Sequence, residues 1–315
     1  MGAFFHAVAV FFHHLTEVKW TALGIALGCQ FVKLLFRARA WQNIVRAAYP
    51  ASRLRYRSAF GAYVAGVGVN SVVPARGGDV VKLYLVKGRI EGGTYATLAP
   101  TLIVETLFDS VTAGIVIAWA LASGVLPTHQ LYSRIPTVDW KFLLRNEHYT
   151  LIALGAALAV AIVGFFVLRR RVAEFRERVR QGFAILGDRP RFLRSVIAPQ
   201  TVSWFFRVAA LYFFLEAFGV HASIHNALLA LVVDSLATLF PATPGGAGTK
   251  QGLIVYVFRG SAISRTALLA FSVGMNIAAT AANIVIGLIS IGLMARTFSF
   301  GKLRARARAE RPDAA

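Results

Sequence analysis

Long apolar runs that alternate with arginine-rich segments constrain the fold of this chain more than any other feature. A helix needs about 20 mainly apolar residues to span the hydrocarbon core of a bilayer. Runs of about this length occupy 20–36, 94–124, 149–168, 195–219 and 266–294. Shorter apolar runs, interrupted by proline and glycine, cover 58–73, 225–240 and 252–258. The pattern predicts an all-α fold, a polytopic integral membrane helical bundle with about five full spans.

Composition excludes the main soluble classes of protein. Hydrophobic residues make up 57% of the chain and charged residues 15%, whereas about 25% of the residues in a soluble domain are charged. This apolar content also excludes intrinsic disorder. The formal net charge of +20 would suit a nucleic-acid binder, but the mean hydropathy of +0.61 does not. We therefore predict a membrane protein with a basic face and no nucleic-acid partner.

The sequence contains no motif that points to a cofactor, a metal or a catalytic group. The single cysteine, Cys29, cannot form an internal disulfide. The cluster of His6, His13 and His14 fits an interfacial segment, because it lacks a full set of metal ligands. A His pair at metal spacing, an Asp-x-Asp motif and a nucleophile elbow are all missing. We expect no catalytic residue, metal or cofactor, and the sequence favours a transporter over an enzyme.

The distribution of Lys and Arg orients the apolar runs, since cytoplasmic loops are enriched in these residues. Twenty-five of the 34 basic residues lie in four segments: 37–57, 76–92, 169–194 and the tail from Arg296. Only six lie in the segments assigned to the other side: 1–19, 125–148 and 259–265. We place the basic segments in the cytoplasm, which predicts a protein of the cytoplasmic (cell) membrane with a cytoplasmic C-terminus.

This orientation places two hairpins on opposite faces of the membrane. Segment 58–92 must leave the cytoplasm and return to it, and 225–258 must do the same from the other side. We interpret both as re-entrant hairpins of an inverted repeat, while two full spans in each place would also satisfy the parity. The predicted organisation is a single transmembrane domain, 1–315, with two halves, a basic linking loop and a basic tail: 1–168, 195–294, 169–194 and 295–315.

Each hairpin turns at a cluster of Pro and Gly that is followed by a basic residue. Such interrupted helices in corresponding halves point to a transporter site. A helix that starts after the cluster would offer free N–H groups and a dipole that favours an anion. The alternative is a tight loop beside an interfacial Arg or Lys. The candidate substrate-binding residues are Asn70, Pro74, Arg76, Gly77, Gly78 and Asp79 in the first tip, and Pro244, Gly245, Gly246, Gly248 and Lys250 in the second.

Charged residues inside apolar runs are the second functional signal, because intramembrane ionisable groups are costly. Glu105 and Asp109 are four residues apart and share a helical face. We add these two acids, together with Arg207 and Glu216, to the candidate binding residues. The acids, with Asp234, are expected to pair with Arg76, Arg207 or Lys250, or to bind a proton or a cationic headgroup; purely structural ion pairs are the alternative. Asp234 is also compatible with an interfacial position, and Lys33 with snorkelling to the surface.

Four segments carry a family resemblance, in the expected order and spacing: Arg37-Ala38-Arg39-Ala40-Trp41, Asn70 to Asp79, Val104 to Asp109, and Pro244 to Gly248. Together they resemble the transmembrane family of lysylphosphatidylglycerol synthase/flippase proteins and its stand-alone relatives. Three positions depart from the pattern: Asp79 replaces the usual Glu, Thr106 an Arg, and Gln251 an acid. The resemblance implies lipid transport, with aminoacyl transfer in a separate soluble domain that we expect to be absent here.

The leading hypothesis is a protein that binds or translocates a lipid with a phosphate or sugar headgroup, by alternating access at the two tips. Its partners would be membrane lipids with anionic headgroups. The resemblance implies candidates among aminoacyl-phosphatidylglycerol, polyprenyl-linked and hopanoid-type lipids. One alternative is a membrane-embedded lipid-modifying enzyme. Another is a scaffold that recruits a separate lipid synthase through loop 169–194, which could equally attract anionic headgroups.

Overall fold

The computed structural model describes residues 18–73, 76–123, 176–239, 249–258 and 263–297. Every regular element in these ranges is a helix, which confirms the all-α class. Three helices are long and apolar enough to cross a membrane: Trp20–Ala48, Tyr95–Ala122 and Arg265–Met294. The four long helices of the bundle are α2 (Trp20–Ala48), α5 (Tyr95–Ala122), α10 (Ala198–Ala217) and α13 (Arg265–Thr297).

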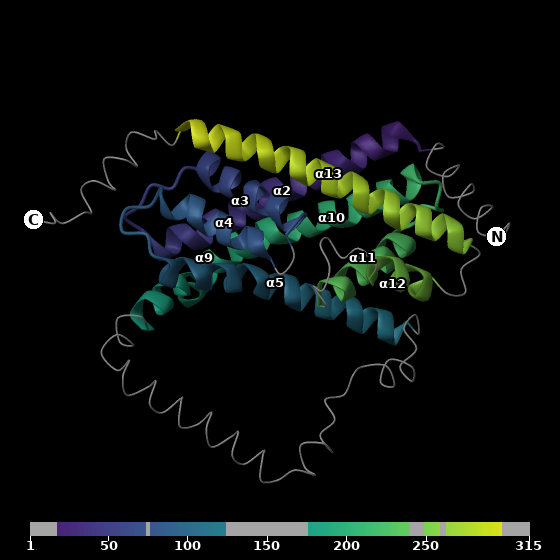
Figure 1. Cartoon of the computed structure of the whole chain (residues 1–315). Helices are drawn as coiled ribbons and strands as arrows, with labels where there is room; N and C mark the ends of the chain where they lie inside the picture. The colour runs from purple at the N-terminus through teal and green to yellow at the C-terminus, as the bar shows by residue number, and fades with distance from the viewer. Residues whose placement is uncertain (1–17, 74–75, 124–175, 240–248, 259–262, 298–315) are drawn as a thin grey trace, which may run out of the picture.

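Two pairs of shorter helices pack with the long helices in the described part of the chain. The first pair is α3 (Tyr56–Asn70) and α4 (Gly77–Lys87), and the second is α11 (Ile224–Leu239) and α12 (Thr249–Val257). At about 1.5 Å per residue, even the longest of these reaches only about 24 Å, short of the roughly 30 Å of hydrocarbon. Figure 1 shows the pairs toward opposite ends of the bundle. Both pairs fall where the sequence predicts hairpins.

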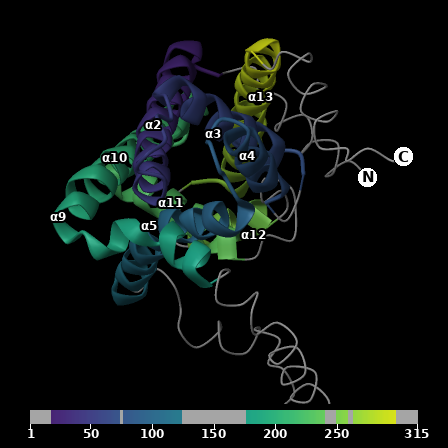
Figure 2. The ribbon, with the colours of Figure 1, turned by 90° about the vertical axis from the view of Figure 1, so that its left-hand side faces the viewer.

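Two helix pairs make the most extensive contacts among the described helices. Helix α10 packs along α2, and α13 packs along α3. Figure 2, which looks along the bundle, shows α2 and α10 together on one side and α13 beside α3 on the other. Helix α5 runs along a third side, in contact with α2, α4 and α11. Its large apolar side chains at four-residue spacing are solvent-exposed, as expected of a face that meets lipid: Ile103, Leu107, Val111 and Ile115.

Glycines allow the first short pair to lie close to its neighbours. A Cβ atom on Gly68 would meet the Cα of Gly287 in α13 at 2.9 Å. A Cβ atom on Gly66 would lie 2.8 Å from the carbonyl oxygen of Gly78 and 2.9 Å from Cβ of Lys82 in α4. Small residues of this kind permit close helix packing inside membranes. They hold α3 between α13 and α4.

The chain enters α10 through three short elements. These are a 3-10 turn η1 (Ala184–Gly187), a helical turn α9 (Arg189–Phe192) and a π-helical turn η2 (Leu193–Ile197). The side chain of Asp188 accepts a hydrogen bond from the Arg191 N–H at the start of α9. The three short elements lie at the end of the bundle where α2 ends and α5 begins (Figure 1).

The helix boundaries match the predicted apolar runs closely, with one informative error. Helix α2 continues to Ala48, whereas the sequence places a cytoplasmic loop from residue 37 onward. Arg37 therefore lies within the bundle, although Arg46 and the arginines of 52–57 remain at its basic end. The predicted run 149–168, the first seven residues of the linking loop (169–175) and nearly all of the tail lie outside the described residues.

Candidate functional site

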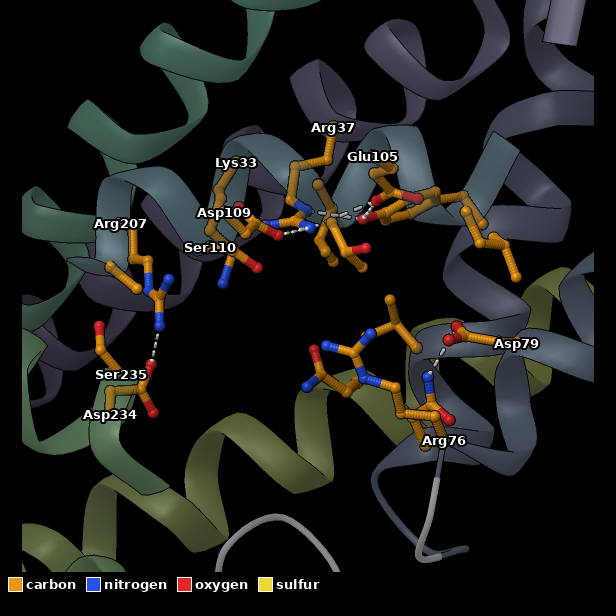
Figure 3. Close-up of a pocket in the computed structure, with 18 of the residues that line it drawn as sticks. Lys33, Arg37, Arg76, Asp79, Glu105, Asp109, Ser110, Arg207, Asp234 and Ser235 are labelled. Carbon is orange, nitrogen blue, oxygen red and sulfur yellow. Dashed lines mark hydrogen bonds and ion pairs between the residues drawn. The ribbon is translucent and has the colours of Figure 1, made fainter. Parts of the chain in front are cut away.

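A cavity with two compartments occupies the middle of the bundle. The large compartment has a volume of about 530 Å³ and the small compartment about 280 Å³. Figure 3 shows charged side chains from several helices around the hollow. The two compartments adjoin one another, because they share seven lining residues: Gln30, Lys33, Val67, Asn70, Arg207, Asp234 and Asn283.

One wall of the large compartment carries four charged side chains that balance one another. This balanced cluster consists of Arg37 of α2, Lys82 of α4, and Glu105 and Asp109 of α5. Lys82 Nζ lies 2.5 Å from Glu105 Oε2, and both side chains are only 5% exposed. Arg37 donates to Glu105 at 3.2 Å and forms a bidentate pair with Asp109, at 3.0 Å for the Nη1 contact. Two cations thus face two carboxylates across three helices.

Aromatic side chains complete the balanced cluster. The Tyr63 hydroxyl donates to Glu105 Oε1 at 2.6 Å and accepts from Arg37 Nε at 2.6 Å. Trp204 of α10 donates its indole N–H to Asp109 Oδ1 at 3.0 Å. The Lys82 ammonium lies 4.2 Å from the ring centroids of both Trp41 and Tyr63. Buried charges need such complete partnering, since a lost partner leaves a large desolvation cost.

The small compartment carries a second group of charges that is not balanced. This cationic cluster consists of Lys33 of α2, Arg207 of α10, Asp234 of α11 and Lys250 of α12, all of which line the small compartment. The Asp234 carboxylate forms ion pairs with Arg207, at 2.5 Å between Nη2 and Oδ2, and with Lys250, at 2.6 Å between Nζ and Oδ1. Arg207 also lies over the Trp204 ring, 4.6 Å from its centroid. Three cations therefore share one carboxylate among the described residues of this compartment.

Two cations of the cavity have no carboxylate within ion-pair distance in the described part of the chain. Lys33 donates only to Gln30 Oε1, at 2.6 Å. Arg76 lines the large compartment and has no ion pair with a described residue. Its backbone has the left-handed conformation, with φ of 58°, which few residues with a Cβ atom adopt. Figure 3 shows the Arg76 side chain reaching into the hollow from the side opposite Arg37 and Glu105.

The first hairpin tip is organised by Asn70 rather than left free for a ligand. Helix α4 begins at Gly77, inside the Pro and Gly cluster rather than after it as predicted. The N–H of Gly78 donates to Asn70 Oδ1 at 2.7 Å, and Asn70 Nδ2 donates to Asp79 Oδ1 at 3.2 Å. With one N–H occupied and a carboxylate in its first turn, this helix N-terminus is a weaker anion site than predicted. The anion-binding capacity of this tip rests on the Arg76 side chain.

The structure brings most of the predicted residues together but changes their partners. Glu105 and Asp109 pair with Arg37 and Lys82, not with Arg76, Arg207 or Lys250. Asp234 pairs with Arg207 and Lys250, as predicted, and lines the cavity rather than the membrane surface.

The remaining predicted positions divide into three groups. Lys33 points into the cavity instead of snorkelling outward (Figure 3). Glu216 lines a separate depression beside Lys19, at the end of α10, and is absent from both compartments. The predicted positions that fall outside the described residues are Pro74, Pro244, Gly245, Gly246 and Gly248.

Sequence reasoning missed the roles of Lys82, Tyr63 and, outside the family motif, Arg37. A usable signal was present, because Gln30, Lys33 and Arg37 are three and four residues apart and so share one face of α2. Lys82 lies in the middle of a short apolar helix, where an ionisable group also points to a partner. Two residues counted among the cytoplasmic charges, Arg37 and Lys82, in fact line the cavity, whereas Arg76 lines it as predicted.

Comparison with known proteins adds family information to this geometry. The family model described as the lysylphosphatidylglycerol synthase TM region matches residues 3–287. A curated UPF0104 membrane protein from Methanocaldococcus jannaschii is 23% identical over 202 residues, which cover 61% of this chain and 79% of that protein. No solved structure matches the chain significantly. The matched family and the apolar helices show an integral membrane protein.

Proposed function

The chain belongs to the lysylphosphatidylglycerol synthase transmembrane-region family, and from this premise we propose that it binds a lipid with a phosphate or sugar headgroup and moves it across the cell membrane. The observation that carries the proposal is the polar, charged cavity in the middle of an otherwise apolar bundle. Charges at such depth are costly and mark substrate pathways in membrane proteins.

The arrangement of the short helices supports a transport mechanism. We propose that α3–α4 and α11–α12 are re-entrant hairpins that enter from opposite faces, with the C-terminus in the cytoplasm. Their helices are shorter than the hydrocarbon core, and they lie toward opposite ends of the bundle (Figure 1). Alternating access would then arise from movement of the two hairpins around a central headgroup.

The charge of the cavity supports a phosphate group in the transported lipid. The described lining residues of both compartments include six cations, Lys33, Arg37, Arg76, Lys82, Arg207 and Lys250, against four carboxylates, Asp79, Glu105, Asp109 and Asp234. Arginine binds phosphate through two parallel N–H donors, and Arg76 has its donors directed into the hollow (Figure 3). Neutral polar side chains such as Gln30, Ser110 and Asn283 suit the hydroxyl groups of a sugar or glycerol headgroup.

Transbilayer movement of fluorescent lipids in proteoliposomes tests the proposal. Arg76→Asn is the informative variant, because Asn removes the charge but tolerates the left-handed backbone that Arg76 adopts. We expect the variant to slow movement of an anionic lipid by about tenfold, the loss of about 1.4 kcal/mol of binding. Lys87→Gln, at the exposed end of α4, is the matched control and should leave the rate unchanged. The proposal fails if wild-type protein moves no phosphate- or sugar-headed lipid, or if Arg76→Asn equals wild type.

A further inference from the structure

The excess positive charge of the cavity is concentrated in the small compartment. There, Lys33, Arg207 and Lys250 are accompanied by Asp234 alone among the described acidic residues. Both oxygens of Asp234 are already engaged, one by Arg207 and the other by Lys250. Lys33 is left with a neutral partner, the Gln30 amide oxygen at 2.6 Å. The compartment therefore holds a lysine amino group that has no carboxylate within ion-pair distance among the described residues.

An uncompensated cation is expensive inside a protein, where charges interact more strongly than in water. Arg37, one turn further along α2, adds positive charge near Lys33. The carboxylates that pair with Arg37, those of Glu105 and Asp109, belong to the balanced cluster. The simplest compensation for Lys33 is an anion that binds from outside the chain. The same lining also contains a buried acceptor without a donor, Oδ1 of Asn283, while its Nδ2 donates to Ser71 at 3.3 Å.

We propose that the small compartment is a binding subsite for an anionic phosphate ester whose headgroup also carries a hydroxyl group. In this subsite Lys33 binds the phosphate oxygens between Arg207 and Lys250, and Asn283 accepts a hydrogen bond from the hydroxyl. Because both Asp234 oxygens are already paired, with Arg207 and Lys250, the compartment has no described carboxylate without a cationic partner to meet a quaternary ammonium or amino group. The subsite therefore selects a net-negative headgroup over a zwitterionic or cationic one. The inference deepens the proposed function, on which it rests for the lipid nature of the ligand.

The lining of the compartment is consistent with a lipid as the source of this phosphate. Leu211, Phe214 and Met275 form the apolar part of the lining of the small compartment. Such a mixture of apolar surface and a few convergent polar groups is typical of small-molecule sites. A free phosphate ester such as glycerol 3-phosphate has the same headgroup chemistry but no use for the apolar part of the lining, so the two sources can be separated by experiment.

Calorimetric titration of the purified full-length chain in detergent micelles tests the subsite. The probes are dihexanoyl phosphatidylglycerol, dihexanoyl phosphatidylcholine and glycerol 3-phosphate. We expect wild-type protein to bind the phosphatidylglycerol about tenfold more tightly than the phosphatidylcholine. Lys33→Gln should lower that affinity about tenfold, and Lys33→Arg should remain within about threefold of wild type, since it keeps the charge.

Two further variants make the outcome decisive. Lys19→Gln removes an exposed lysine at the far end of the same helix and should bind like wild type. Asn283→Asp places a carboxylate in the compartment and should weaken binding of the anionic probe even if Lys33→Gln fails to fold. Glycerol 3-phosphate binding with the same Lys33 dependence would support the subsite and identify a free ester as its ligand. Equal affinity for the two lipids, or no effect of Lys33→Gln and Asn283→Asp, would overturn it.

Failure of the subsite and failure of the proposed function give different results. If Lys33-dependent binding is measured but no lipid crosses the bilayer, the subsite stands and transport is wrong. If lipid crosses the bilayer at the wild-type rate in Lys33→Gln, transport stands and the subsite is wrong.

Discussion

The balanced cluster and the cationic cluster contain similar residues but differ in the balance of their charges. Each combines an arginine of a long helix with a lysine of the second helix of a short pair: Arg37 with Lys82, and Arg207 with Lys250. The balanced cluster sets these two cations against Glu105 and Asp109, whereas the cationic cluster sets its own against Asp234 and adds Lys33. The first arrangement is complete without a ligand, and the second is not.

On this difference we base the proposal that the balanced cluster is structural and the cationic cluster binds a ligand. In the balanced cluster, Tyr63, Trp41 and Trp204 occupy the remaining positions around the charges. In the cationic cluster, Lys33 meets only a neutral amide among the described residues. Charge at membrane depth is therefore not by itself a sign of ligand binding. The informative feature is a charged side chain whose nearby counter-ions are already paired with other side chains.

The largest expected effect comes from breaking the balanced cluster. Glu105→Gln should destabilise the protein by about 3–5 kcal/mol, because it leaves the buried Lys82 without a carboxylate. Thermal unfolding of the detergent-solubilised protein measures this as a lowered midpoint. The control is Glu177→Gln, whose partner Arg180 lies 3.4 Å away in a pair with side chains 66% and 80% exposed; such pairs contribute at most about 1 kcal/mol. Equal midpoints for the two variants would contradict the structural role of the cluster.

A second variant asks whether the cost arises from the stranded ammonium. Replacing a buried ion pair by neutral groups of similar volume is often tolerated. Glu105→Gln combined with Lys82→Met should therefore recover about half of the stability lost by Glu105→Gln alone. The two single variants and the double variant form a mutant cycle, again read by thermal midpoints. A double variant less stable than Glu105→Gln would show that Lys82 contributes to stability chiefly through its contacts with the aromatic rings of Trp41 and Tyr63.

The cationic cluster should respond in the opposite way to loss of its carboxylate. Asp234→Asn lowers stability in the absence of ligand, but it raises the positive charge of the small compartment. We expect about fivefold tighter binding of dihexanoyl phosphatidylglycerol, visible as a larger ligand-induced rise of the midpoint than in wild type. Glu105→Gln should show no such gain. The same response in both variants would remove the distinction between the two clusters.

The smallest effect is expected from Lys250→Gln. This change leaves Arg207 paired with Asp234 and lowers the charge of the small compartment by one. Affinity for the anionic probe should fall about threefold, less than for Lys33→Gln, because Lys250 already has a carboxylate partner. Stability should fall by less than in Glu105→Gln, because Asp234 keeps its pair with Arg207 and no buried cation loses its carboxylate. A loss as large as that of Lys33→Gln would make Lys250 the principal phosphate contact.

Local features of the sequence predicted the helices well. The ends of α5, α10, α11 and α13 fall within a few residues of the predicted runs. The exception, α2, shows why the method has a limit. Arg37 follows an apolar run, so the hydropathy pattern places the end of the span at this residue. The helix continues through Arg37 inside the bundle, because Glu105 and Asp109 of α5 form ion pairs with it.

The pairing of charges could not be predicted in the same way. Glu105 and Asp109 share a face of α5 by spacing alone, but which cation faces them depends on the rotation and depth of four other helices. The sequence predicts Arg76, Arg207 and Lys250 as partners for these acids. In the structure, Lys82, six residues after Arg76, meets Glu105 at 2.5 Å, and Arg76 makes no ion pair with a described residue.

The sequence by itself therefore determined the all-α membrane architecture, the positions of the helices and the two interrupted pairs. Run length, charge asymmetry and the Pro and Gly breaks are local properties of the chain, and each has a direct effect on how a segment sits in a bilayer. Only the tertiary structure decided which charges are neutralised and which remain open to a ligand. That outcome depends on contacts between helices far apart in the chain, where a difference of one helical turn determines whether a cation meets a carboxylate or an empty cavity.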